Sequence, residues 1–204
     1  MRRLWIAVVV IAVVSGAALF AVRGLGVSAR PQPSWVETRA ALLLRQWMTP
    51  ERYKNLKNPV SAAPAAITSA REHFADHCAS CHGNNGSGET AIGKALYPKA
   101  PDMRAAHTQA LSDGELFYFI EQGVRLTGMP GWTTGTPEGE TASWQLVHFI
   151  RHLPALTPEE EAGMARFNPR SPAEIEEERK AEDFLSGGAP PAPDAPDPHA
   201  GHKR

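Results

Sequence analysis

The sequence predicts a mostly α-helical protein. In several segments apolar residues recur three or four positions apart, a spacing that gathers them on one face of a helix. Some of these segments begin at a serine or threonine that can cap a helix, and no segment alternates apolar and polar residues convincingly as a β-strand does. We therefore expect a helical domain that follows a transmembrane helix and an amphipathic stalk helix, and that precedes a partly disordered tail.

Composition limits the protein to one ordinary domain with additional segments. The chain has 204 residues, of which 21 are Lys or Arg and 22 are Asp or Glu, and the net charge of −1 argues against a dedicated nucleic-acid-binding protein. Two cysteines are too few for a disulfide scaffold. Apolar residues make up 42% of the chain, which is enough for a core but not for several membrane spans.

Charge and composition divide the chain into four predicted parts. Residues 1–30 are a membrane anchor or signal segment, 31–67 a basic stalk, 68–156 the main domain, and 157–204 an acidic and then Pro/Ala-rich tail. The first seventy residues carry nine basic and two acidic side chains, whereas residues 157–185 carry four basic and nine acidic ones.

The N-terminal segment is a candidate membrane anchor. The run from Leu4 to Val22 carries no charge and follows Arg2 and Arg3. As a helix it spans about 28 Å, close to the hydrocarbon thickness of a bilayer, and it is longer than the core of a secretory signal, which has about 7–15 residues. We favour an uncleaved anchor; the alternative is a cleaved signal peptide, because small residues follow at 27–29. Arginines flank both ends of the run, so charge alone does not set its orientation.

The segment Cys78-Ala79-Ser80-Cys81-His82 carries the main chemical signal, the pattern Cys-x-x-Cys-His. Two thiols three positions apart on a helical turn can each form a thioether with haem, and His82 then lies below the iron as an axial ligand. The pattern indicates one covalently attached haem c. A redox dithiol or half of a zinc site is less favoured, because no βαβ pattern and no second cysteine pair accompany it. We interpret His77 as a surface helix residue.

Haem attachment of this type occurs outside the cytoplasm. The domain is therefore expected on the periplasmic or outer face of the cytoplasmic membrane, tethered by a single span.

Met129 is the expected second axial ligand of the haem iron. It lies in Gly128-Met129-Pro130-Gly131-Trp132, where glycine and proline specify an irregular turn that can aim one side chain inward. Methionine opposite histidine raises the haem potential and suits electron transfer, whereas an open site suits gas or peroxide chemistry. The other candidates are interpreted as packing residues or as a solvated helix face: Met48, Met103 and Met164 as packing, and His148 with His152 as the solvated face.

Three helices are expected around the haem. The first covers residues 67–78 and begins at Thr68 or Ser69. The second begins with a capping box at Ser112–Glu115, and the third starts at Ser143 and ends at a proline.

These features together resemble the class I, monohaem c-type cytochromes over residues 68–154. The resemblance rests on Phe74 before the haem motif, on Gly128-Met129-Pro130, and on the helix segment Trp144–Arg151. The proline and tryptophan after the methionine are similar to those in cytochromes of membrane oxidase and dehydrogenase systems. The family implies that the first and last helices of the haem domain cross, with Phe74 against Leu146 and Phe149.

The resemblance also implies partners for the haem and its ligands. A proline carbonyl after the motif should accept a hydrogen bond from the far ring nitrogen of His82, and such bonds orient a ligand and tune its metal. Pro98 and Pro101 are candidates, and we favour Pro101. The candidates for contact with the haem or its propionates are Trp132, Arg104 and Arg125.

The stalk and the tail carry weaker signals. Residues 34–48 predict an amphipathic helix whose apolar face can lie on anionic lipid, on the haem domain or on a partner subunit, and periodicity does not choose among them. Residues 173–185 predict an acidic helix, and the chain from Gly187 onward is not expected to pack. His199 and His202 are interpreted as part of a solvated tail. The apolar face of the stalk helix consists of Val36, Ala40, Leu43, Leu44 and Trp47.

The sequence favours an electron-transfer protein over an enzyme, because nothing in it supplies a general base or nucleophile for a substrate pocket. The expected function is a membrane-tethered periplasmic cytochrome that carries single electrons through one haem. Its expected partners are redox proteins of a membrane electron-transport chain and the lipid bilayer, with no nucleic acid. The alternatives are a redox subunit of a larger membrane oxidoreductase and, less favoured, a haem-based sensor or peroxidase.

Overall fold

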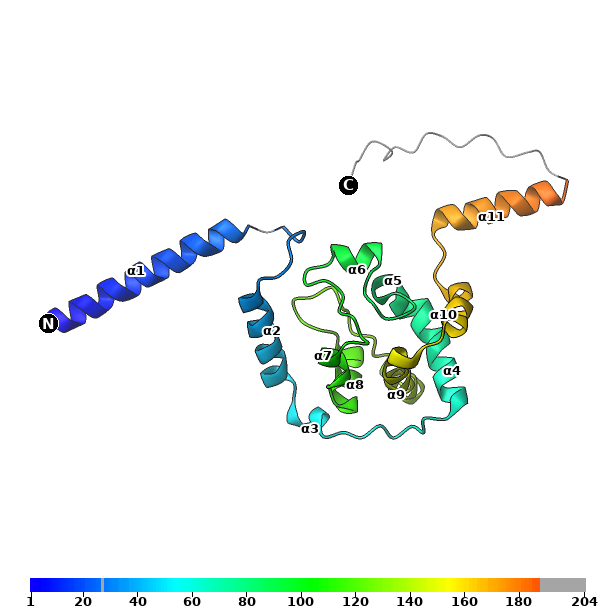
Figure 1. Ribbon diagram of the computed structural model, residues 1–204, viewed down its shortest axis with the longest axis horizontal. Helices are drawn as coiled ribbons and strands as arrows, with labels where there is room; N and C mark the ends of the chain where they lie inside the picture. Colours follow the sequence, from blue (N-terminus) through cyan, green and yellow to red (C-terminus); the bar gives the residue numbers. More distant parts are fainter. Residues whose placement is uncertain (27, 188–204) are drawn as a thin grey trace.

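A computed structural model of the protein describes residues 1–26 and 28–187 (Figure 1). Within these ranges the chain forms helices and no strand, which confirms the mostly α-helical fold. The residues from 188 onward, with His199 and His202, lie outside the described part. The helices are α1 (Arg2–Leu25), α2 (Trp35–Met48), α3 (Glu51–Lys54), α4 (Pro64–His73), α5 (Ala79–His82), α6 (Ala91–Ala95), α7 (Ala106–Gln109), α8 (Asp113–Gln122), α9 (Pro137–His152), α10 (Pro158–Met164) and α11 (Pro172–Leu185).

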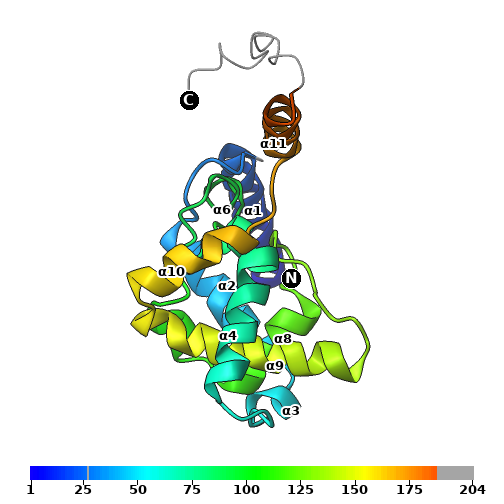
Figure 2. The ribbon, with the colours of Figure 1, turned by 90° about the vertical axis from the view of Figure 1, so that its right-hand side faces the viewer.

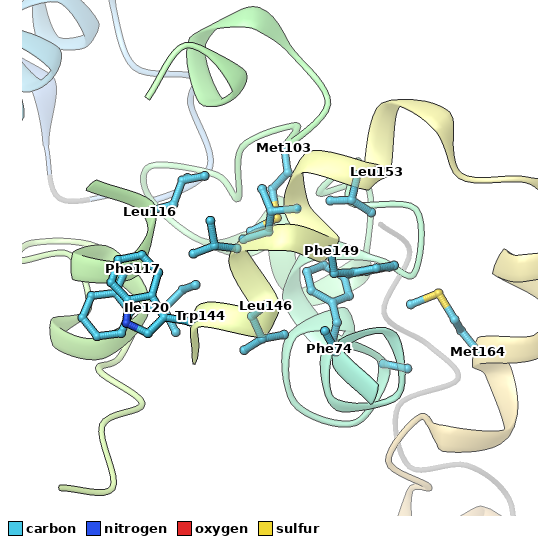
Figure 3. Close-up of a cluster of buried hydrophobic side chains, with 14 residues drawn as sticks. Phe74, Met103, Leu116, Phe117, Ile120, Trp144, Leu146, Phe149, Leu153 and Met164 are labelled. Carbon is cyan, nitrogen blue, oxygen red and sulfur yellow. The ribbon is translucent and has the colours of Figure 1, made fainter. Parts of the chain in front are cut away.

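The core lies where α4 and α9 cross, with α8 on the other side of α9 (Figures 1 and 2). The rings of Phe74 and Phe149 pack with centroids 5.1 Å apart, as expected from the family resemblance. On the opposite side of α9, Trp144 stacks on Phe117 with centroids 4.0 Å apart and planes within 6°. Figure 3 shows these rings in one continuous apolar cluster. The helices α4 and α8 thus pack against opposite sides of α9.

The helix α9 begins earlier than the sequence predicts. Its N-cap is Thr136, whose side chain accepts a hydrogen bond from the backbone N–H of Gly139, and Pro137 occupies the first helical position. Ser143 is not a cap but a buried residue inside the helix, where its hydroxyl lies 2.6 Å from the buried carboxylate of Glu121. The predicted start was wrong because this serine serves a tertiary contact.

The helix α4 also begins earlier than predicted, at Pro64 rather than at Thr68 or Ser69. Proline is favoured at the first helical position because its missing N–H is unpaired there in any case. After His73 the helix widens into a π-helical turn over Phe74–Cys78 before α5 continues it. Such turns occur often at functional sites, and this one leads directly into the haem motif.

The packed unit extends beyond the predicted borders at 68 and 156. Upstream, the side chain of Asn58 donates to the carbonyl of Trp144 at 2.8 Å, and the ring of His148 lies 2.7 Å from the carbonyl of Val60. Downstream, Met164 of α10 is fully buried in the same core. The end of the stalk and the start of the tail therefore belong to the folded domain.

Two packing assignments need correction. His148 and His152 do not form a solvated face, because both are half-buried and His152 lies 3.0 Å from the carboxylate of Glu160 in α10. Met48 is 54% exposed and does not pack in the core. Met103 and Met164 are core residues, as predicted.

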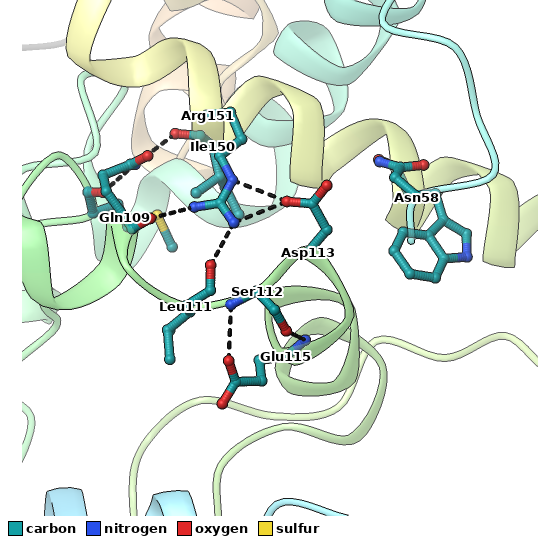
Figure 4. A network of polar contacts seen from close by, with 10 residues as sticks. Asn58, Gln109, Leu111, Ser112, Asp113, Glu115, Ile150 and Arg151 are labelled. Carbon is teal, nitrogen blue, oxygen red and sulfur yellow. Dashed lines mark hydrogen bonds and ion pairs between the residues drawn. The ribbon is translucent and has the colours of Figure 1, made fainter. Parts of the chain in front are cut away.

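A polar network joins α9 to the segment before α8 (Figure 4). The guanidinium of Arg151 forms an ion pair with Asp113 at 2.8 Å and donates to the backbone carbonyls of Gln109 and Leu111. Ser112 caps α8 and forms the predicted capping box with Glu115. The network fixes the direction in which α8 leaves the loop.

The helix α1 stands apart from this core (Figure 1). It contains the 19-residue apolar stretch Arg2–Phe20, which is long and apolar enough to cross a membrane. In the C-terminal part, α11 is also largely exposed, with Ile175 and Phe184 open to solvent.

Candidate haem site

The haem motif forms the end of the helical arm that α4 begins. Cys78 and Cys81 are half-buried free thiols, and His82 is buried at 8% exposure as the last residue of α5. Gly83 ends the arm with a φ of 74°, a conformation that favours glycine. The chain turns sharply there, so that His82 stands at the corner between the arm and the following loop.

The imidazole of His82 is buried in the domain. Burial lowers the pKa of His82, which keeps the ring neutral, and the backbone carbonyl of Pro101 acts in the opposite direction. The Nδ1 atom is fully buried and has no partner in hydrogen-bonding geometry among the described residues. The carbonyl of Pro101 is thus close enough to raise the pKa of this ring, as the family resemblance implies, although its geometry falls short of a full hydrogen bond to Nδ1.

The thiol of Cys78 is poorly suited to disulfide exchange. Burial, with a smaller effect of Cys81, raises the pKa of Cys78 to about 12. Redox dithiols instead have thiols with lowered pKa values, because the thiolate is the reactive form. The environment of the motif therefore disfavours the redox-dithiol interpretation.

The loop after His82 is folded back onto the motif. The backbone N–H of Gly88 donates to the carbonyl of His82 at 2.7 Å, and the hydroxyl of Thr90 lies 3.0 Å from the carbonyl of Cys81. A Cβ atom at Gly93 would lie 2.2 Å from that same carbonyl, so the position requires glycine. Sequence reasoning missed Thr90 and Gly93, although the spacing of a threonine cap three residues before a glycine was visible.

The loop that carries Met129 is also tightly structured. The backbone carbonyl of Met129 accepts a hydrogen bond from the N–H of Val124 at 3.1 Å, and the backbone N–H of Met129 donates to the hydroxyl of Thr127 at 3.1 Å. Gly123 has a φ of 69° and lies close to the backbone of residues 129–131. A Cβ atom added at Gly123 would lie within 2.7 Å of that backbone. Met129 is half-buried, on a loop fixed to the end of α8.

Two contacts bring the Met129 loop to the segments around the haem motif, one to the loop after the motif and one to the arm itself. Gly128 lies against the side chain of Leu96, at the end of α6. Trp132, which is 39% exposed, meets the ring of His77 edge to face with centroids 5.5 Å apart. His77 is exposed as predicted, yet it also joins the two halves of the site.

Comparison with known protein families agrees with this arrangement. Residues 65–150 match the family described as cytochrome c oxidase, cbb3-type, subunit III. The protein carries a cytochrome c domain. No curated protein matches the chain. The cytochrome c domain implies haem c binding and haem-based electron transfer, in a free redox partner or in an oxidase subunit.

The residues of the cytochrome c domain fit a covalently bound haem. Two thiols that form no disulfide stand one helical turn apart, beside a buried histidine kept neutral by its surroundings. Neutral imidazole and methionine sulfur are both ligands that haem iron accepts. Among the residues that the structure describes, no three His, Cys, Asp or Glu side chains gather as a separate metal site.

The two arginines predicted to contact a haem propionate differ from each other in their surroundings. Arg104 is engaged with Asp102 through two hydrogen bonds of 2.9 Å, and Arg125 is exposed. Another arginine, Arg45 of α2, contacts α8, where its guanidinium lies over the ring of Phe119 at 5.5 Å. Burial lowers the pKa of Arg45, with Glu115 acting in the opposite direction.

Proposed function

We propose that the protein is a membrane-tethered c-type cytochrome that carries single electrons through one haem c. Cys78 and Cys81 would attach the haem by thioethers, and His82 and Met129 would be its axial ligands. The observation that carries the proposal is that the Met129 loop lies against the segments around the haem motif, with Trp132 on His77 of the arm and Gly128 on Leu96 of the following loop. Haem, when bound, supplies a one-electron couple between ferric and ferrous iron.

The protein residues would position and tune that couple. Burial excludes water from His82, and the thioethers would keep the haem in place through many redox cycles. A methionine ligand raises the potential, which suits electron transfer rather than gas binding. Pro101 and Trp132 would pack at the haem, and a small shift of the Pro101 carbonyl toward Nδ1 of His82 would orient the ring.

The proposed location is the cytoplasmic membrane, with the cytochrome domain on the periplasmic or outer face. The support is α1, the one helix of the described residues that is long and apolar enough to cross a membrane, together with haem attachment of this type, which occurs outside the cytoplasm. In this arrangement α1 would remain uncleaved as an anchor.

A second candidate is a haem-carrying subunit of a terminal oxidase complex. The description of the matching family as an oxidase subunit III favours it. Solubilising native membranes in mild detergent separates the two candidates. A free carrier is recovered alone, whereas an oxidase subunit is recovered with partner chains in fixed proportion.

The haem ligation is tested by Met129→Ala. We expect the variant to have a lower midpoint potential and to bind CO when reduced, because axial ligands set haem potentials over a range of about 0.8 V. The measurement is an absorption spectrum recorded during a redox titration, with CO added to the reduced protein. The control is Met48→Ala, which removes an exposed methionine outside the site.

An unchanged spectrum and potential in Met129→Ala would exclude this methionine as a ligand. A wild-type haem that is high-spin or binds CO readily would favour the sensor or peroxidase interpretation instead.

A further inference from the structure

The stalk helix α2 presents its apolar side to the outside of the molecule. None of its residues, all within the described part of the chain, is buried. Val36, Leu43, Leu44 and Trp47 are 53–81% exposed, and Trp35 at the start of the helix is 78% exposed. An exposed apolar surface of this extent on one helix marks a contact with another apolar phase.

The other side of α2 is attached to the cytochrome domain. Glu37 accepts a hydrogen bond from the hydroxyl of Tyr97 at 2.9 Å, and Arg45 lies over the ring of Phe119 in α8. Thr49, directly after the helix, is buried. The helix cannot turn its apolar side inward without losing these contacts. The cytochrome domain is therefore not what covers that side.

The position of α1 indicates what covers the apolar side of α2. In Figure 1, α2 lies between α1 and the domain and runs across the direction of α1, and in Figure 2 both helices lie behind the domain. The nine residues 26–34 connect the two helices, and an extended chain of this length reaches about 30 Å. Glu37 and Arg45 hold one side of α2 on the domain, so the exposed apolar side is turned away from the domain. In Figure 1, α1 extends on that same side of α2.

We propose that α2 lies on the surface of the bilayer that α1 spans, with its apolar side in the lipid interface. Tryptophan is enriched at this depth, and Trp35 and Trp47 stand near the two ends of the helix. The exposed Arg30 and Arg39 are placed to meet anionic headgroups. Because α2 is fixed to Tyr97 and Phe119, it would hold the cytochrome domain in one orientation, with the edge containing these residues toward the membrane.

The proposal rests on the membrane tether of the proposed function, but not on the haem ligands. The test therefore uses the full chain in nanodiscs of neutral and anionic phospholipid, with a nitroxide label at one introduced cysteine. Leu43→Cys and Trp47→Cys report on the exposed side of α2, Val10→Cys reports on α1, and Ala162→Cys reports on the exposed surface of α10. The unsubstituted chain, labelled in parallel, gives the background from Cys78 and Cys81.

The measurement is the collision rate of each label with oxygen, which concentrates in lipid, relative to a water-soluble nickel complex. We expect the oxygen-to-nickel ratio at residues 43 and 47 to exceed that at residue 162 several-fold and to approach that at residue 10.

Two results would overturn the proposal while leaving the tether intact. One is a water-like ratio at residues 43 and 47 together with a lipid-like ratio at residue 10. The other is labels that are protected from both reagents in native membranes but water-accessible in nanodiscs, which would assign this side of α2 to a partner protein. A water-like ratio at residue 10 would instead refute the tether itself.

Discussion

The helices α9 and α2 are alike in sequence and opposite in surroundings. Both are amphipathic, both begin at a polar side chain that caps the first turn, and both end in a turn that carries arginine. The helix α2 buries no residue in the described structure, whereas α9 is clamped between α4 and α8. An apolar stripe thus identifies a surface that must be covered, but the cover depends on what the rest of the chain brings to it. The residues that α9 buries are Ser143, Trp144, Leu146, Val147, Phe149 and Ile150.

The largest expected effect tests this contrast directly. Phe149→Ala removes a fully buried ring from the contact with α4 and should lower the free energy of unfolding by about 3–5 kcal/mol. Leu43→Ala in α2 should change it by less than about 0.5 kcal/mol, because that side chain is 63% exposed. Denaturant unfolding of both variants in the same detergent measures the difference. Equal losses would mean that α2 is part of the folding core and would remove the contrast.

A middle-sized effect concerns the polar side of α9. Arg151→Met keeps most of the side-chain stem but removes the ion pair with Asp113 and the bonds to the carbonyls of Gln109 and Leu111. We expect a loss of about 2 kcal/mol, less than for a fully buried pair because both charged side chains are about one-third exposed.

The control for this network is Asp113→Asn. It leaves both bonds from Arg151 to backbone carbonyls in place and should cost less than Arg151→Met when both are measured by thermal unfolding. A larger loss for Asp113→Asn would show that the ion pair, rather than the carbonyl bonds, fixes the start of α8.

The smallest expected effect concerns the acidic segment, in which α10 is attached to the core and α11 is exposed. The backbone N–H of Thr157 and the ring of His152 lower the pKa of Glu160 below its ordinary value of 4.5, and Arg71 adds to this effect. A carboxyl group with a lowered folded-state pKa stabilises the fold above its unfolded-state pKa. That contribution disappears as the pH falls through the folded-state pKa.

Stability should therefore differ between the wild type and Glu160→Gln near neutral pH, and the difference should shrink as the pH falls from about 6 to about 3. Glu159→Gln, which changes an exposed neighbour in α10, serves as the control. A difference that stays constant over this range would show that the charge of Glu160 does not attach α10 to the core.

Local signals were predictable where local interactions decide the structure. The capping box at Ser112 is present at the predicted position, because a capping box needs only residues three positions apart. The helix start predicted at Ser143 was wrong, since the hydroxyl of Ser143 donates a hydrogen bond to Glu121 of another helix instead of capping α9. The predicted domain borders were too narrow because Val60 and Met164 are held by α9 and by the core, not by their sequence neighbours.

Some features of the candidate site were predictable from local sequence, and others were not. The motif at residues 78–82 and the turn around Met129 were visible in the sequence, because covalent attachment and tight turns impose fixed residue types and spacings. The contacts of Gly93 with the Cys81 carbonyl and of Trp132 with His77 were not visible, since they join segments far apart in the chain.

The sequence by itself determined the helical fold, the apolar N-terminal span and the cytochrome c pattern, since each depends on periodicity, length or fixed spacing. Only the tertiary structure decided that the Met129 loop lies against the haem-motif arm, and that α9 is buried while α2 keeps its apolar side exposed. Periodicity sets the direction of side chains around a helix axis, but the contacts that cover a face depend on how distant segments close the chain upon itself.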